Sequence, residues 1–311
     1  YLPAWVMVSG KENHRRFSYD RDIKSALDFR PFDLDARLIG ELKKAFSEER
    51  DTRRSFAVTI ADDATVSTYV EGVIENGKDE INLAYMTRRY SEFVENPFLA
   101  RMLANEHVKK LEKVLGLETL NSEFGFITSF MCRRLDSEKQ KQEEAIFADL
   151  LAKKQLVLAV GTDPELGWRV PETDEIAAAG IPHPFKFYLF EDVDVPSLNS
   201  LEWSVAEELE KQEKILWWFR NKTGRKWFSI QGWRENKIRP DFVAARKEGD
   251  RLQLLYVFES KGEHLLGSTD TQYKKAVFDV MTAQRKAKTI RIIEQPKLPF
   301  GKVNDEVEFH I

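Results

Sequence analysis

The stretch from Pro240 to Gly262, PDFVAARKEGDRLQLLYVFESKG, constrains the fold more than any other part of the chain. Its run Leu254–Phe258 is continuously apolar or aromatic, which is typical of a strand covered on both faces. Three charged side chains, Asp241, Glu259 and Lys261, border this strand and the apolar segment before it. Charges beside buried strands cost free energy unless they are paired or used in chemistry, so these three residues are the first candidates for a functional site.

The length of 311 residues predicts two domains. We expect a mixed α/β linking region over residues 1–195 and a compact α/β domain over residues 196–311. The hydrophobic content is 42%, and no apolar run approaches the length of a membrane span, so neither a span nor a secretory leader is predicted. The first residue is Tyr1 rather than Met, which suggests a piece of a longer protein.

Cysteine, histidine and charge exclude several classes of protein. The single Cys132 excludes an internal disulfide framework and fits a reducing cytoplasm, and its apolar neighbours favour a packed thiol. The five histidines form no pair with the spacing of zinc ligands. Residues 201–311 contain 21 Lys and Arg against 17 Asp and Glu, whereas the whole chain has a net charge of −4. The C-terminal part is therefore the better partner for a polyanion.

The coarse pattern of elements separates the two halves. In the first half we expect strands at 4–10, 56–61, 68–74 and 81–86 and helices at 96–116 and 121–154. The prolines of residues 180–200 suit a connector. The second half predicts the order helix, strand, strand, strand, helix and strand, at 200–220, 227–232, 238–245, 252–260, 270–287 and 289–294. No GxxxxGK[ST] loop is present in the chain, so no ATPase motor is predicted within it.

The charged residues around the two C-terminal strands suit phosphodiester hydrolysis. Glu259 and Lys261 project to the same side of their strand, and a neighbouring strand that begins at Asp241 would bring a second carboxylate to them. Mg²⁺ takes carboxylate and carbonyl oxygens, so Asp241, Glu259 and the backbone carbonyl of Ser260 are candidate ligands. Lys261 would position the attacking water and offset negative charge on phosphorus. The alternative is a turn at Asp241 and a surface ion pair between Glu259 and Lys261.

A fourth acid, Glu202, lies in the predicted helix NSLEWSVAEELEKQEKILWWFRN. It falls on the apolar stripe, from which it could reach a metal site. On the opposite face lie Glu207, Glu210, Lys211 and Lys214, which form (i, i+4) pairs of opposite charge. The alternative is structural, because Asn199 and Glu202 also have the spacing of a capping box.

Aromatic and basic residues of the same region suit a nucleic acid. Four tryptophans between residues 217 and 233 could stack on bases, although tryptophan among strand residues favours a core. Better candidates for contacts to DNA phosphates are the basic residues Arg220, Lys226, Arg234, Arg239, Lys274 and Lys275.

These segments together resemble a known family. The runs NSLEWSVAEELEKQEKILWWFRN, IQGW, IRPDFVA and VFESKGEHLLGSTDTQYKK are similar to the C-terminal endonuclease region of the Res (restriction) subunit of type III restriction enzymes and their helicase–nuclease relatives. The resemblance covers residues 196–287. It is looser upstream, where NPFLARML and EEAIFADLL resemble the segment that joins the family's motor to its nuclease.

The resemblance implies a PD-(D/E)xK restriction-endonuclease-like fold, a mixed sheet flanked by helices. It makes Asp241, Glu259 and Lys261 catalytic and Glu202 the helix-borne acid. It also implies cleavage of double-stranded DNA with Mg²⁺ or Mn²⁺, an ATP-driven helicase motor in the same full-length polypeptide, a modification (methyltransferase) subunit as partner, and no membrane. Two alternatives stay open: a DNA clamp or subunit-docking domain that does not cut, and a nuclease for branched or single-stranded DNA.

Overall fold

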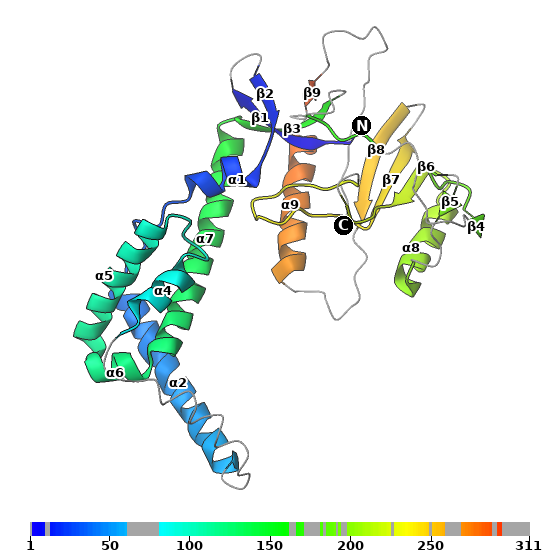
Figure 1. Ribbon diagram of the computed structural model, residues 1–311. Coiled ribbons are helices and arrows are strands. Elements are labelled where there is room, and N and C mark those ends of the chain that lie inside the picture. Colours follow the sequence, from blue (N-terminus) through cyan, green and yellow to red (C-terminus); the bar gives the residue numbers. More distant parts are fainter. Residues whose placement is uncertain are drawn as a thin grey trace. The chain divides into compact units, whose positions relative to one another are not determined.

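The computed structural model describes residues 2–9, 13–60, 81–161, 166–170, 181–182, 185–190, 192–193, 198–224, 227–248, 251–258, 269–287 and 291–293 (Figure 1). The chain divides into two compact units, one formed by Leu27–Glu143 and the other by Tyr1–Ala26 together with Glu144–Ile311. Among the helices of the described ranges, none combines the length and the apolar composition that crossing a membrane requires.

The regular elements described in the unit Leu27–Glu143 are all helices. They are α2 (Ala36–Ile60), α4 (Leu83–Tyr90), α5 (Pro97–Leu115), α6 (Leu117–Ser122) and the first part of α7 (Phe124–Ala152). In α5 the Asn96 side chain accepts hydrogen bonds from the backbone of Phe98 and Leu99, and Gly116 caps the other end at a φ of 81°. The helices predicted at 96–116 and 121–154 are therefore confirmed as α5 and α7.

Two strands predicted in this part of the chain are wrong. Residues 56–60 continue α2, because helix propagation is cooperative and overrides the β preference of a short segment. Residues 83–86 begin α4, where the Asn82 side chain accepts a 2.9 Å hydrogen bond from the Tyr85 backbone and the buried Met86 and Tyr90 have helical spacing. The strand predicted at 68–74 lies outside the described residues.

The other unit contains a four-stranded mixed sheet with the order β2-β1-β3-β9. Its strands are β1 (Ala4–Ser9), β2 (Asn13–Arg16), β3 (Leu156–Gly161) and β9 (Arg291–Ile293). β1 is antiparallel to β2 and β3, and β9 is parallel to β3. The strands predicted at 4–10 and 289–294 are confirmed as β1 and β9. Short elements of the same unit are α1 (Tyr19–Asp22), a 3₁₀ turn (Lys24–Ala26), β4 (Ile181–Pro182) and β5 (Asp192–Val193).

The segment that carries the predicted site folds into a second sheet between two helices. In chain order its elements are α8 (Ser200–Lys211), β6 (Ile215–Arg220), β7 (Phe242–Glu248), β8 (Arg251–Phe258) and α9 (Thr269–Lys286). The strands form an antiparallel sheet in the order β6-β7-β8, with α8 beside β6 (Figure 1). β7 is buried over Phe242–Ala245, as expected for a strand covered on both faces.

Three predictions for this segment need correction. The helix predicted at 200–220 ends at Lys211, because the aromatic residues that follow pair with β7 as a strand. At 227–232, the described residues form no strand, and Ile230 makes only an isolated bridge with Ile238. The sheet of this segment was predicted to be mixed, but β6, β7 and β8 pair antiparallel, and β9 pairs in parallel with β3 in the other sheet.

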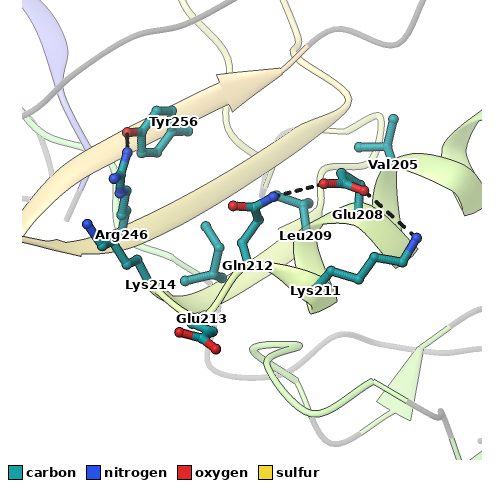
Figure 2. Close-up of a pocket in the computed structure, with 10 residues that line it drawn as sticks. Val205, Glu208, Leu209, Lys211, Gln212, Glu213, Lys214, Arg246 and Tyr256 are labelled. Atoms are coloured by element: carbon teal, nitrogen blue, oxygen red, sulfur yellow. Dashed lines mark hydrogen bonds and ion pairs between the residues drawn. The ribbon is translucent and has the colours of Figure 1, made fainter.

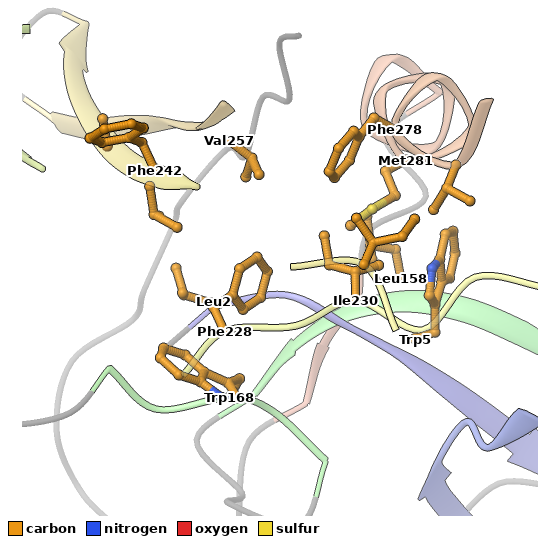
Figure 3. Close-up of a cluster of buried hydrophobic side chains, with 14 of the residues drawn as sticks. Leu2, Trp5, Leu158, Trp168, Phe228, Ile230, Phe242, Val257, Phe278 and Met281 are labelled. Atoms are coloured by element: carbon orange, nitrogen blue, oxygen red, sulfur yellow. The ribbon is translucent and has the colours of Figure 1, made fainter. Parts of the chain in front are cut away.

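One hydrophobic core of this unit contains residues of the four-stranded sheet and of the three-stranded sheet β6-β7-β8 (Figure 3). Trp5 and Leu158 of the mixed sheet share it with Phe242 of β7 and Met281 of α9. Gly232 lies so close to Tyr273 and Val277 of α9 that an added Cβ atom would overlap both side chains. The two predicted domains, 1–195 and 196–311, therefore do not coincide with the compact units, because residues from both contribute to this core.

Candidate functional site

Asp241 lies at the start of β7, directly before Phe242. Phe242 pairs with Arg220, the last residue of β6, and with Phe258, the last residue of β8. Asp241 is therefore at the edge where β6 and β8 end and β7 begins. Glu259 and Lys261, predicted as catalytic, and Ser260, predicted as a metal ligand through its backbone carbonyl, lie outside the described residues.

A pocket of about 340 Å³ opens at this edge of the sheet. It brings Asp241 together with Glu202 from α8, although the two residues are far apart in the sequence. The residues that line it are Glu202, Arg220, Asn221, Lys222, Thr223, Arg239, Pro240 and Asp241. Three cations and two carboxylates thus face one small cavity, a combination suited to a phosphate group and a hard metal ion.

Glu202 has two structural partners in addition to its place in the pocket. One carboxylate oxygen accepts a 2.9 Å hydrogen bond from the backbone N–H of Asn199, and the Asn199 side chain accepts from the Glu202 backbone, which completes the predicted capping box. The other oxygen accepts from Arg220 at 3.0 and 3.3 Å. The two side chains are only 8% and 21% exposed, so solvent screens this ion pair weakly.

Asn221 was not predicted as a site residue, yet it determines where Asp241 lies. Its side-chain amide donates to the carbonyls of Phe228 and Pro240 at 2.8 and 2.9 Å and accepts from the Phe228 backbone at 2.9 Å. Its backbone N–H donates to the carbonyl of Asp241 at 2.7 Å. The only signal in the sequence is a polar residue between two aromatic runs, WWFRN and WFSI.

Glu210 was predicted to pair with Lys214 one turn further along the helix, but α8 ends at Lys211 and Lys214 lies beyond it. Its carboxylate accepts hydrogen bonds from the backbone of Lys186 at 2.7 Å and Phe187 at 2.9 Å, and from the indole of Trp218 at 2.7 Å. Because α8 ends at Lys211 and β6 turns back beside it, this carboxylate connects three segments. Trp218 and Trp233 are buried, as the core interpretation of the tryptophans predicts.

The predicted DNA-binding residues occupy different surroundings. Arg220 and Arg239 line the pocket. The Arg234 guanidinium packs over the Tyr273 ring at 4.5 Å, and Lys274 pairs with Asp270 at 3.2 Å within α9. Lys275 is exposed on α9, and Lys226 lies outside the described residues. Among the predicted DNA-binding residues that the structure describes, Arg220 and Arg239 are those that share a pocket with Asp241.

A larger pocket of about 770 Å³ lies where α8 is followed by β6 (Figure 2). Arg246 donates a 2.9 Å hydrogen bond to the Tyr256 hydroxyl there, and Glu208 accepts one from Gln212 at 2.8 Å. Of the predicted catalytic acids, the two that the structure describes, Glu202 and Asp241, are not among the residues that line this pocket. Its size alone does not make it the better candidate for chemistry.

Within the described ranges, no group of three or more His, Cys, Asp and Glu residues is arranged to hold a metal ion. Comparisons with protein-family models, with curated proteins and with solved structures gave no significant match. The function is accordingly argued from the site and from the resemblance of the sequence.

Proposed function

We propose that this chain carries a metal-dependent endodeoxyribonuclease site that hydrolyses phosphodiester bonds of double-stranded DNA. In this proposal Asp241, Glu259 and Lys261 are the catalytic residues, and Glu202 is the acid contributed by the helix. The segment from α8 to β9 would then be a variant of the PD-(D/E)xK fold. Its order of helix, three antiparallel strands, helix and strand supports that assignment.

The observation that carries the proposal is the pocket shared by Asp241 and Glu202. Glu202 lines this pocket from α8 and Asp241 from the residue before β7. The basic residues that line the same pocket are Arg220, Lys222 and Arg239. Guanidinium groups bind phosphate oxygens with charge-assisted hydrogen bonds, and carboxylates bind hard cations. A phosphodiester group is the substrate that uses both sets of side chains.

The register of β7 and β8 supports a role for Glu259. Phe242 and Phe258 pair across the two antiparallel strands. Asp241 precedes one of these residues and Glu259 follows the other, so we expect both carboxylates at the same edge of the sheet, roughly within 5 Å of each other if they share one Mg²⁺ at ligand distances near 2.1 Å.

The donor set of the site fits a Mg²⁺ or Mn²⁺ ion. Asp241 and Glu259 with the carbonyl of Ser260 would hold it, since these are the hard oxygen ligands that such ions prefer. When bound, the ion supplies a Lewis acid for the phosphate and acidifies a bound water. Lys261 would orient the attacking water, while Arg220 and Arg239 hold phosphate oxygens and offset their negative charge.

The proposed substrate and partners follow the resemblance. They are double-stranded DNA, a helicase motor in the same full-length chain, which would use ATP, and a methyltransferase subunit. The test is therefore made with the chain in the motor-containing protein and its modification partner. Supercoiled-plasmid cleavage and DNA binding at fixed salt are measured with Mg²⁺ and with EDTA.

We expect Asp241→Ala and Lys261→Ala to abolish cleavage and to leave DNA binding nearly unchanged. Hydrolysis depends on one small set of groups, whereas binding free energy comes from many contacts to phosphates. Asp279→Ala and Lys286→Ala, which remove one exposed charge each from α9, serve as matched controls and should retain cleavage. Cleavage that persists in both site variants, or in EDTA, would refute the nuclease proposal and favour a DNA clamp.

A further inference from the structure

The carboxylate of Glu202 is already engaged by two donors of the protein, and one of them is an arginine of the same pocket. Its Oε1 accepts from Nε of Arg220 at 3.3 Å and from Nη2 of Arg220 at 3.0 Å. Its Oε2 accepts from the backbone N–H of Asn199 at 2.9 Å. Glu202 and Arg220 both line the pocket that contains Asp241. The acid contributed by the helix is therefore paired with a cation inside the candidate site.

The two partners of this ion pair are held by different elements. Glu202 lies in the first turn of α8, where the capping box ties its side chain to Asn199. Arg220 is the last residue of β6 and pairs with Phe242, the residue that follows Asp241. Because both backbones are fixed, the ion pair holds the guanidinium at the edge of the sheet where Asp241 lies.

This arrangement suits a bound anion better than a metal ion on Glu202. A metal ion bound to Oε1 would lie close to the guanidinium, and the side chains of Glu202 and Arg220 are only 8% and 21% exposed, so the repulsion of the two cations would be weakly screened. A phosphate, in contrast, is attracted by Arg220. An arginine that is already fixed also loses less rotamer entropy when it binds a phosphate.

We propose that Glu202 is a positioning residue, which holds Arg220 ready to bind a DNA phosphate and does not itself ligate the metal. The inference rests on the proposed function, because it takes the anion in this pocket to be a DNA phosphate. It assigns to the acid of the helix a task that differs from that of Asp241. Glu202 acts through Arg220 and makes no contact with the reacting atoms.

The proposal predicts an effect of unusual sign. Removal of a carboxylate from a surface that binds a polyanion ordinarily strengthens binding, because repulsion of the phosphates is lost. The same result is expected for a metal ligand when no metal is present. If Glu202 positions Arg220, its removal weakens DNA binding even though one negative charge has been taken away.

The test is binding of the 311-residue chain to a fluorescent DNA duplex in EDTA, where no metal can act. Arg220→Gln should bind roughly tenfold more weakly at low salt, with the slope of log K against log salt reduced by about 1, as expected for one lost phosphate contact. Glu202→Ala should bind roughly threefold more weakly or worse. The double variant should bind no more weakly than Arg220→Gln, because the anchor has no effect without the arginine.

Two matched controls separate this effect from charge and from loss of the helix cap. Glu207→Ala removes one negative charge from the exposed side of α8 and should not weaken binding. Asn199→Ala removes the cap side chain but leaves the partner of Arg220, so it should lower the melting temperature and retain binding. Glu202→Gln keeps the shape of the side chain and should show a smaller loss in the same direction, which covers the case in which Glu202→Ala does not fold.

Unchanged or tighter binding by the Glu202 variants would overturn the proposal, as would a double variant that binds more weakly than Arg220→Gln. An equal loss in Asn199→Ala would assign the effect to the cap, and no binding by the unaltered chain would remove the phosphate from the inference. Failure of the nuclease proposal is read separately, from cleavage by Asp241→Ala. DNA binding that depends on Glu202 and Arg220 in a protein that does not cut would leave this inference standing while the proposed function fails.

Discussion

Asn221 is a single residue whose hydrogen bonds fix the backbone of Phe228, Pro240 and Asp241 beside the candidate site. It follows Arg220 at the end of β6, is 7% exposed, and bonds to backbone groups of Phe228 and Pro240. Its own N–H donates to the carbonyl of Asp241. The position of the Asp241 side chain therefore depends on contacts made by a residue with no expected part in the chemistry.

Asn221→Ala should lower the free energy of unfolding by about 2–4 kcal/mol, because it leaves buried backbone groups of Phe228 and Pro240 without partners. Urea denaturation followed by tryptophan fluorescence measures this loss. Thr223→Ala, an exposed change in the lining of the same pocket, should stay within about 0.5 kcal/mol of the unaltered chain. A similar small effect of Asn221→Ala would show that water replaces the lost bonds and that Asn221 does not hold Asp241 in place.

Glu202 combines a structural and a proposed catalytic role, and Glu202→Gln separates them. We expect a loss of about 1–2 kcal/mol of stability, because an amide cannot accept from both Asn199 and Arg220 as the carboxylate does. If Glu202 also acts in the site, cleavage measured well below the melting temperature should fall at least roughly tenfold. Glu207→Gln, on the exposed side of the same helix, should alter neither quantity by much. Unchanged turnover in Glu202→Gln would restrict Glu202 to its cap and ion pair.

At the scale of elements, α4 and α5 are joined by a buried polar pair. The Tyr90 hydroxyl and His107 Nδ1 are 2.9 Å apart, and His107 is 1% exposed. Burial lowers the pKa of His107 to about 4, while nearby Asp33 raises it and Lys110 lowers it further. The imidazole is therefore neutral in the folded protein at neutral pH.

The stability of this helical unit should fall as the pH is lowered from about 6.5 to 4. In that window the unfolded chain binds a proton at His107 that the folded chain does not, so the free energy of unfolding decreases by up to roughly 1.4 kcal/mol per pH unit. At pH values above the pKa of His107 in the unfolded chain, His107 is neutral in both states and the free energy of unfolding no longer depends on it. Helical circular dichroism in urea at a series of pH values measures the effect. His107→Gln should flatten the curve in this window, and an unchanged slope would assign the pH dependence to other groups.

The elements that could be predicted from the sequence are those whose local signals agree. In α5 the Asn96 cap, Pro97 and Gly116 mark both ends of a helical apolar stripe, and β7 begins within four residues of the predicted strand. Predictions failed where local preference and tertiary pairing differ. Trp217 and Trp218 continue a helical pattern in the sequence but form β6, because β7 supplies a partner across the sheet.

The candidate site could be predicted in part for the same reason. Asp241, Glu202, Arg220 and Arg239 were expected in one site, and all four line one pocket. Asn221 and Glu210 could not be predicted, since their roles depend on hydrogen bonds to backbone groups that only the folded chain brings near.

At the scale of the whole molecule, each compact unit has its own hydrophobic core. Leu103 and Leu111 of α5 belong to the core of Leu27–Glu143, and Val243 and Phe278 belong to the core of the other unit. Helix α7 contributes to both, with Met131 in one and Phe147 in the other. Separate cores favour unfolding of one unit while the other stays folded. The continuous helix α7 favours unfolding of both units in one cooperative transition, and an experiment can distinguish the two outcomes.

We expect the two units to respond separately to substitutions in their cores. Leu103→Ala should cost about 2–5 kcal/mol, because it creates a cavity around a side chain that is 1% exposed, and should accelerate hydrogen exchange in α5 while leaving β7 protected. Val243→Ala should do the reverse, with faster exchange in β7 and unchanged protection in α5. Hydrogen exchange with mass spectrometry at residues 97–115 and 242–248 reports both units in one experiment. Equal acceleration in both segments by either substitution would mean that α7 couples the cores into one cooperative unit. In that case the loss of stability caused by protonation of His107 would extend to the unit that contains the candidate site as the pH falls toward 4.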